Sequence, residues 1–389
     1  MKTMIEFAHV DVILFLAAMI LIVGYLEEKG FFEFVAWKVI SCARASFRAL
    51  FLTVILLSAF LAALVDEVTS ILIVSSFAFK ICELLGISPL PMVLASVFAT
   101  NIGSSMTVVG NPVGVLLAFS AGLTFSEFLR WATPNSLIAV LATAGILMRQ
   151  FKDYVEEGQE ALAKPLEWEA AEAQSPRSLV VDGALFASVI LLLALHHPLE
   201  EVLGLSKNTL LLAVPMLASG LILLLDPERG FRAFEHRVEW RTLLFFLLLF
   251  ASVGTLEYVG LLSDFSRALT LVAGGSLESV LLALVPVASL MSASLDNVLA
   301  VAILVPVIRG LGEAAIPTYP LWWATLFTAC YSANFTPVGS TANIVAAGLL
   351  ERRGVRVSLL EWIKKSVYST VVSLALALLL VYVQVPLMP

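Results

Sequence analysis

The sequence predicts an all-α polytopic membrane protein of two inverted repeats, with two re-entrant helical hairpins and two broken transmembrane helices. Three observations lead to this fold class. Hydrophobic residues make up 60% of the 389-residue chain and charged residues 14%, too little polar surface to cover a soluble protein of this size. A weak internal repeat relates the two halves, and most lysines and arginines fall on one side of the predicted topology.

The repeat consists of four short segments that recur in the same order, the first three with an offset of 229 or 230 residues. The pairs are Gly24-Tyr25-Leu26-Glu27 with Gly254-Thr255-Leu256-Glu257, Asp66-Glu67-Val68 with Asp296-Asn297-Val298, Thr107-Val108-Val109-Gly110 with Thr336-Pro337-Val338-Gly339, and Glu127-Phe128-Leu129-Arg130 with Glu361-Trp362-Ile363-Lys364. A duplication with glycine-rich polar breaks at matching places is typical of secondary transporters whose site lies between two halves.

The predicted crossings follow from segment length, since about 20 apolar residues span a bilayer as a helix. Six segments are near this length: 8–26, 133–148, 178–195, 208–225, 242–258 and 366–386. Two longer segments, 89–120 and 318–350, would each be roughly 48 Å long as straight helices. Both carry Gly, Pro, Asn, Ser and Thr near their middles, so each is predicted to be one crossing broken near the membrane centre.

Two further apolar segments, 47–85 and 277–311, have acidic residues at their centres. A pair of half-length helices that meet at a polar tip fits such a segment better than one spanning helix. The short piece 31–44 carries Glu33, Lys38 and Arg44, which suits a helix lying in the membrane interface.

Eight crossings and two hairpins place 18 of the 23 lysines and arginines on one side, which the positive-inside tendency makes the cytoplasm. Both termini are then extracytoplasmic. The hairpin 47–85 enters from the cytoplasm and the hairpin 277–311 from outside, so the repeats are inverted. The predicted organisation is repeat 1 (1–148), a cytoplasmic linker (149–177) and repeat 2 (178–389), whose first two helices (178–225) are extra scaffold helices.

The acids at the hairpin tips are candidates for coupling to an ion or a proton, because carboxylates at membrane depth are costly. These residues are Asp66, Glu67 and Asp296, with Asn297 at the position equivalent to Glu67. Two adjacent acids in a low dielectric repel each other, which favours protonation of one of them. The structural alternative is that each acid caps the second helix of its hairpin.

The broken crossings supply the second set of candidates. Pro112 and Pro337 remove backbone donors, and the freed carbonyls could replace the hydration shell of an ion together with Ser, Thr and Asn oxygens. Half-helix N-termini could instead hold an anion, or the segments could be kinks for tight packing. The predicted lining residues are Thr69, Asn101, Gly103, Ser104, Ser105, Thr107, Gly110, Asn111, Asn334, Thr336, Gly339, Ser340, Thr341 and Asn343, with Na⁺ as a possible metal ion at the same residues.

The remaining polar residues of interest are predicted to be helix caps, exposed loop residues or packing residues. Glu27 and Glu257 are interpreted as solvated helix caps, and His196 and His197 as exposed histidines of an outer loop. The three cysteines are scattered and indicate neither a zinc site nor a disulfide framework. No nucleophile with a base and no HExxH pattern occurs, so an enzyme is not predicted. No cofactor beyond the coupling ion, Na⁺ or H⁺, is expected.

At the tips Asp66 to Thr69 and Asp296 to Val298, and in the breaks Thr107 to Pro112 and Thr336 to Asn343, the chain resembles the ion transporter superfamily. The resemblance is to the branch of arsenite efflux pumps and NhaD-type sodium/proton antiporters, with citrate and dicarboxylate transporters as relatives. It implies inverted repeats, a homodimer, and an elevator movement of hairpins and broken helices past a static scaffold.

Two departures from the resemblance affect the expected substrate. Carboxylate symporters carry a Ser-Asn-Thr type motif at the hairpin tips, whereas this chain has acids there. The arsenite and NhaD-like branch has Asp-Asn at both tips, whereas the first tip here is Asp66-Glu67.

The sequence therefore predicts a secondary active transporter of the inner or plasma membrane that works by alternating access. The leading hypothesis is cation/proton antiport or proton-driven efflux of a small oxyacid such as arsenite. A sodium-coupled carboxylate or anion transporter is the first alternative, and a channel is the second. The expected partners are the lipid bilayer, a small ion or molecule and a second copy of the chain, with no nucleic acid.

Overall fold

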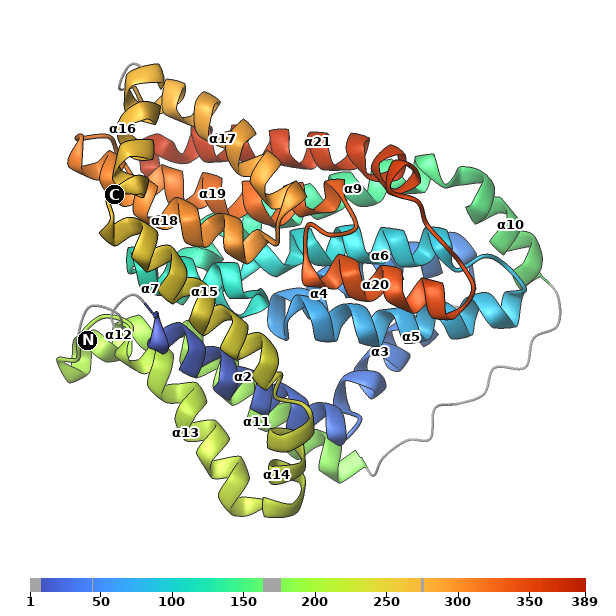
Figure 1. The fold of residues 1–389 in the computed structure, drawn as a ribbon. Helices are drawn as coiled ribbons and strands as arrows, with labels where there is room; N and C mark the ends of the chain where they lie inside the picture. The colour runs from blue at the N-terminus through green and yellow to red at the C-terminus, as the bar shows by residue number, and fades with distance from the viewer. Residues whose placement is uncertain (1–7, 44, 164–175, 274–275) are drawn as a thin grey trace.

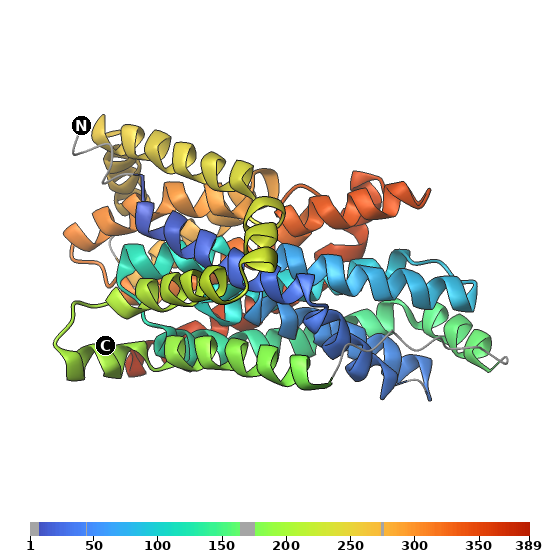
Figure 2. The same cartoon turned by 90° about the horizontal axis from the view of Figure 1, so that it is seen from below.

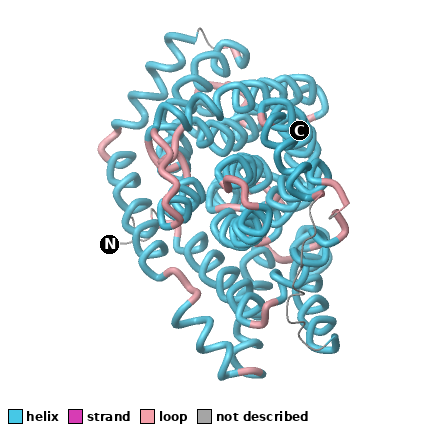
Figure 3. Tube along the Cα trace, turned by 90° about the vertical axis from the view of Figure 1, so that its right-hand side faces the viewer, coloured by secondary structure: helices cyan, strands magenta, loops and turns pink. Residues whose placement is uncertain are grey.

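The computed structural model describes residues 8–389 except 44, 164–175 and 274–275, and the regular elements in this part are helices joined by loops (Figures 1 and 3). The first half contains α2 (Val10–Glu28), α3 (Phe31–Ser41), α4 (Phe47–Leu64), α5 (Glu67–Leu85), α6 (Leu90–Gly103), α7 (Pro112–Ala121), α8 (Phe125–Glu127), α9 (Thr133–Gln150) and α10 (Lys152–Leu162). The second half contains α11 (Pro176–Ala194), α12 (His196–Leu203), α13 (Thr209–Leu225), α14 (Pro227–His236), α15 (Trp240–Tyr258), α16 (Leu261–Ala273), α17 (Leu277–Ser294), α18 (Asn297–Glu313), α19 (Tyr319–Ser332), α20 (Thr341–Arg352) and α21 (Leu359–Gln384).

The predicted architecture is confirmed. Seven of the described helices are long and apolar enough to cross a membrane, or eight if the bent pair α11 and α12 counts as one span. Helices α4 and α5 form one hairpin, and α17 and α18 form the other. The broken crossings are α6 with α7, separated by the short turns Ser104–Met106 and Val108–Gly110, and α19 with α20, separated by Ala333–Phe335 and an extended stretch.

The two hairpins point toward the centre of the molecule from opposite ends (Figures 1 and 2). The end that carries the start of α4, the end of α5 and α10 is called the basic end below, because the sequence places most lysines and arginines there. Helix α17 starts at the opposite end, where α21 also ends (Figure 1). The described repeats are thus inverted relative to each other.

Several helices were not predicted, and each is short or polar. They are α10, within the predicted linker, and α12, α14 and α16. The interpretation of His196 as an exposed loop residue is wrong: it lies at the start of α12 and its side chain is fully buried, whereas His197 is partly exposed. Helix α10 packs on the first hairpin, where the Phe47 N–H donates to Gln159 Oε1 at 2.9 Å.

Close packing of α4 against α6 supports the first hairpin and its neighbouring break. A Cβ added to Gly103 would lie 2.2 Å from the backbone oxygen of Ala59, which no side chain can tolerate. Gly110 approaches Ser104 O at 2.1 Å in the same construction, and Gly339 approaches Ala333 O at 2.4 Å. These predicted site glycines therefore serve close backbone packing in the structure.

Gly103→Ala should lower the free energy of unfolding by about 2 kcal/mol or more, because backbone must move to admit the methyl group. The measurement is the thermal unfolding midpoint of purified protein in detergent. Gly220→Ala on α13 is the matched control, since its added Cβ meets nothing within 4 Å and alanine favours a helix. Equal midpoints for the two variants would contradict the close approach of α4 and α6.

Candidate ion-coupling site

The tip acids begin the second helix of each hairpin. Asp66 Oδ1 accepts the N–H groups of Val68 and Thr69, both at 2.8 Å. Asp296 Oδ1 accepts the N–H of Val298 at 2.9 Å, and its Oδ2 accepts the Thr341 hydroxyl at 3.3 Å. Each acid therefore neutralises the positive end of a half-helix within the protein.

The same threonine in each repeat ties the break to its hairpin. Thr107 Oγ1 donates to Ala63 O at 2.5 Å, and Thr336 Oγ1 donates to Ala293 O at 2.5 Å. The two threonines share an extended backbone conformation, and the two alanines lie near the end of the first helix of their hairpins. The carbonyls freed where α4 and α17 end are thus satisfied by equivalent side chains.

A buried amide cluster joins the two broken crossings. Asn101 Nδ2 donates to Asn334 Oδ1 and to Asn343 Oδ1, both at 2.7 Å, and its Oδ1 accepts the Ser340 hydroxyl at 3.0 Å. All four side chains are buried. The structure therefore brings together predicted site residues that are more than 230 positions apart in the chain.

Several freed carbonyls of the second break are engaged by side-chain donors. Asn343 Nδ2 donates to Ala333 O at 2.8 Å and to Thr336 O at 2.7 Å. Trp362 Nε1 donates to Asn334 O at 2.9 Å. These oxygens hold the break together, so an ion that used them would compete with existing hydrogen bonds.

Glu67 is the least satisfied acid of the site. It is 3% exposed, and its Oε2 has no hydrogen-bond partner. Ser104 and Asn297 lie beside it, and Asp66 and Asp296 are close enough to act on its charge. Asn297 is fully buried, and neither its amide oxygen nor its amide nitrogen has a hydrogen-bond partner. Buried polar atoms without partners call for a ligand, an ion or water, and here they gather where the two tips meet.

Asn111 connects Glu67's surroundings to the first break. Its Nδ2 donates to Ser104 Oγ at 2.7 Å and contacts Cys330 Sγ at 3.1 Å, while its Oδ1 caps α7 by accepting the Gly114 N–H. Cys330 was not predicted as a site residue, because a lone buried cysteine carries no sequence signal beyond packing. Ser105 points elsewhere: it shares a hydrogen bond with Ser136.

A cavity of about 90 Å³ lies where both tips face the rest of the molecule. Its polar lining includes five predicted site residues, Asp66, Glu67, Thr69, Asn111 and Thr341. The apolar walls are formed by Phe15, Leu16, Met19 and Ile20 of α2 and Phe246 of α15. Arg237 and Glu239, just before α15, line the cavity as well. This volume admits a small ion with a few waters.

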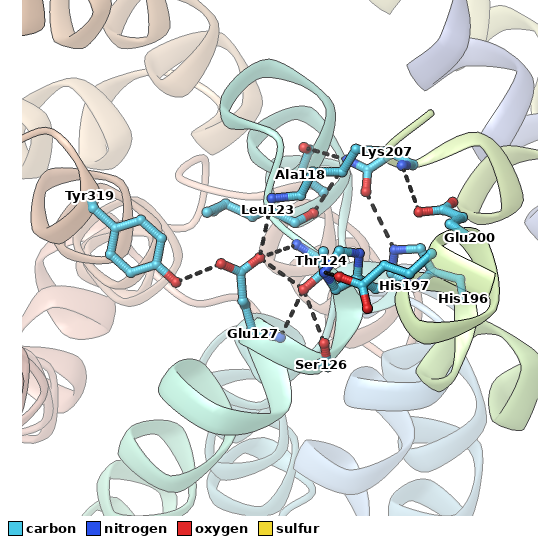
Figure 4. Close-up of polar contacts among 12 residues, drawn as sticks. Ala118, Leu123, Thr124, Ser126, Glu127, His196, His197, Glu200, Lys207 and Tyr319 are labelled. Atoms are coloured by element: carbon cyan, nitrogen blue, oxygen red, sulfur yellow. Dashed lines mark hydrogen bonds and ion pairs between the residues drawn. The ribbon is translucent and has the colours of Figure 1, made fainter. Parts of the chain in front are cut away.

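A polar network around α8 lies at the end of the molecule opposite the basic end (Figure 4). Glu127 accepts the Tyr319 hydroxyl at 2.8 Å and the Thr124 N–H at 2.6 Å. Asn208, before α13, donates to Ala118 O at 3.1 Å at the end of α7. Buried Glu200 accepts the backbone N–H groups of Asn208 and Leu210. The network links α12 and α13 to the first broken crossing.

The family model described as "Citrate transporter" (CitMHS) matches residues 1–328. The chain belongs to the CitMHS citrate transporter family. This CitMHS chain is 32% identical over 374 residues to an uncharacterized transporter of Mycobacterium tuberculosis, a match covering 94% of this chain and 84% of the relative. It is 32% identical over 373 residues to the 46 kDa membrane protein of Mycobacterium leprae, with the same shares covered.

More distant relatives extend the likeness. The CitMHS chain is 25% identical over 441 residues to the human P protein, covering 95% of this chain and 53% of that protein. The crystal structure of the YdaH transporter of Alcanivorax borkumensis matches with a TM-score of 0.68 and 18% identity, over 99% of this chain and 87% of that one, which shows the fold. The resemblance to the ion transporter superfamily is confirmed, and the CitMHS chain is a secondary transporter of a multi-pass membrane family.

Asn101→Ala should lower the free energy of unfolding by about 3 kcal/mol, since it leaves the Asn334, Asn343 and Ser340 groups without their shared partner. Thermal unfolding in detergent measures the effect. Asn135→Ala is the control: it breaks the amide pair of Asn135 with Gln384, at 3.1 and 2.9 Å, and should cost about 1 kcal/mol. A smaller loss for Asn101→Ala than for the control would show that the cluster does not hold the breaks together.

Proposed function

We propose that the chain couples the movement of a small cation to that of protons by alternating access, with Asp66, Glu67 and Asp296 carrying the coupling charge. The observation that carries the proposal is the buried Glu67 carboxyl, whose Oε2 lacks a partner and which lines a cavity together with Asp66. An acid in this position must bind a proton or a cation to reside stably at membrane depth. The basic end is the cytoplasmic end in this proposal.

The half-helix ends favour a cation over a free anion. Four helices begin at the site, α5, α7, α18 and α20, and each N-terminus is capped by a side chain of the protein. Asp66 and Asp296 supply two of these caps as carboxylates. An anionic substrate that needs positive helix ends would have to displace them. Antiport of a cation and protons therefore agrees with the site better than uptake of a free carboxylate.

The same site could serve proton-driven efflux of a small neutral oxyacid such as arsenite, because a neutral molecule meets no repulsion from the tip acids. A second candidate is citrate, which the description of the family model favours. Citrate would meet Asp66, Glu67 and Asp296 as like charges. It would therefore need to arrive with a cation, or after the acids are protonated. In the carboxylate alternative, citrate is therefore transported together with a cation or with protons.

The position of the cavity supports an elevator movement. Arg237 and Glu239 belong to the loop at the basic end of α15, yet they line one cavity with the hairpin tips. The tips thus lie level with the end of a scaffold helix, as expected if hairpins and broken helices have moved toward the basic end. On the opposite side, the network around Glu127 and Asn208 holds the end of α7 and the start of α19 to their neighbours. We propose that the structure represents the inward-facing state.

The function is tested with protein in liposomes that contain a pH-sensitive dye. Sodium, arsenite, and citrate with and without Mg²⁺ are each added outside, at two pH values. Cation/proton antiport predicts that sodium releases protons from the lumen and that citrate alone does not. Citrate uptake that requires no added cation and is insensitive to pH would overturn the proposal. Saturation with increasing substrate distinguishes the carrier from a channel.

Glu67→Gln should abolish the response of transport to a pH gradient, with at least a tenfold loss of coupled flux, because the amide cannot exchange a proton. The variant is nearly isosteric, so unfolding midpoints should remain close to that of the unchanged protein. Glu313→Gln, at the exposed end of α18, is the matched control and should transport normally. A Glu67→Gln protein that keeps full pH-dependent flux would remove Glu67 from the coupling role.

A further inference from the structure

The two glutamates that the repeat aligns, Glu27 and Glu257, lie at opposite ends of one pair of neighbouring helices. Glu27 is in the last turn of α2, and Glu257 is in the last turn of α15. Helices α2 and α15 pack against each other and run in opposite directions (Figure 1). The two ends of this helix pair therefore each carry one repeat-related glutamate, Glu27 on the side of the basic end and Glu257 on the opposite side.

On the side of the basic end, Glu27 belongs to a charged cluster that joins the site cavity through Arg237 and is named the inner mouth. Arg237 donates from Nη1 to Glu27 Oε1 at 3.0 Å and from Nε to Glu28 Oε1 at 2.6 Å. The Glu27 side chain is 17% exposed, so its interpretation as a solvated cap is wrong. Gly24 makes this contact possible, since a Cβ there would lie 2.5 Å from Arg237 Cβ.

The inner mouth adjoins the cavity that contains Glu67, whose Oε2 has no hydrogen-bond partner. Arg237 lines the 90 Å³ cavity together with Asp66 and Glu67, and Glu27 lies close enough to Asp66 for their charges to interact. Glu239 also lines this cavity, and Glu33 interacts with Glu27 and Arg237. Acids outnumber the single arginine among these described residues, so the mouth attracts cations and repels anions.

At the other end of the helix pair, the repeat-related residues line a second, smaller cavity of about 10 Å³. Gly254 and Glu257 of α15 line it, as do His9, just before α2, and Arg309 of α18. Arg309 donates to Ser120 O at 2.8 Å, at the end of α7. The lining contains none of the tip acids, so this cavity does not reach the site in the present state.

The two ends of the α2–α15 pair are built alike. At each end, the glycine and glutamate of one helix lie beside residues that precede the other helix. On the side of the basic end, Gly24 and Glu27 contact Arg237, which lines the larger cavity together with Glu239. At the other end, Gly254 and Glu257 line the smaller cavity together with His9, just before α2. Inverted repeats exchange conformations between the two states of a transporter, so the smaller cavity is the counterpart of the larger one.

We propose that Glu27 and Glu257 are repeat-related specificity residues at the mouths of the two access paths, used in turn, where each selects for cations on its own side. This inference rests on the proposed function. Glu27 acts while the hairpin tips face the basic end. Glu257 acts after the tips have moved to the opposite end, when the second cavity opens toward the site.

The first test uses vesicles of the two orientations, so that sodium is added at one chosen end while an entrapped dye reports proton movement. Glu27→Gln should raise the half-saturating sodium concentration about three- to tenfold from the basic end only. Glu257→Gln should do so from the opposite end only. In each case the maximal rate should change little, and Glu27→Asp should restore the response. Glu351→Gln, exposed at the end of α20, is the matched control.

The second test does not depend on transport. Val68→Cys, which lines the cavity, is labelled with a cationic and an anionic thiol reagent in a protein whose exposed Cys42 is replaced by serine. The cationic reagent should react faster, and Glu27→Gln should lower the ratio of the two rates about threefold. Glu257→Gln should leave this ratio unchanged.

The two tests separate the inference from the proposed function. If the unchanged protein moves no protons in response to sodium, the proposed function fails, while the labelling ratio still reports whether Glu27 controls the mouth. If transport is normal but both variants alter it equally from both ends, or if Glu27→Gln leaves the labelling ratio unaltered, the assignment of the two mouths is wrong.

Discussion

The satisfaction of backbone groups inside the membrane is the constraint on which the rest of this structure depends. Both hairpins and both broken crossings end helices where lipid offers no hydrogen bonds. The protein meets this cost with side chains at equivalent positions: Thr107 and Thr336 donate to Ala63 O and Ala293 O, and Asp66 and Asp296 accept from the helices that follow them. These polar residues of the repeat therefore stabilise the helix ends, in addition to any role in transport.

Glu67 and Asn297 are the pair of tip residues that breaks the symmetry of these equivalent hydrogen bonds. Once the caps and the amide cluster of Asn101 have taken their partners, the unpartnered atoms at the tips belong to Glu67 and Asn297. They occupy equivalent places in the two repeats, and Asn297 lies beside Glu67. A carboxyl facing an amide can share a proton or a cation without the repulsion that a second carboxyl would bring. In the proposed function, this departure from symmetry puts the exchangeable charge at one place, between the two tips.

Much of the fold was predictable because its signals are local. An acid in the middle of a long apolar segment fixed the hairpins, whose helices α4 and α5 span the predicted 47–85, and the lysine and arginine distribution gave their opposite directions. The short helices α12, α14 and α16 were missed because length and hydropathy do not mark them. The burial of His196 and the contact of Cys330 with Asn111 were also missed. Such contacts depend on how segments far apart in the chain pack, which periodicity does not encode.

The cost of moving the site explains why transport would be coupled. Three acids meet at the tips, and the one cation among the described lining residues of the cavity, Arg237, is already engaged by Glu27 and Glu28. An aspartate at the centre of a membrane helix costs roughly 2.5 to 3.5 kcal/mol even on permissive scales. In the proposed elevator movement, Arg237 belongs to the static scaffold and does not travel with the hairpins. The tips then cross only when protons or a cation neutralise their charge, so each passage carries a bound ion or proton.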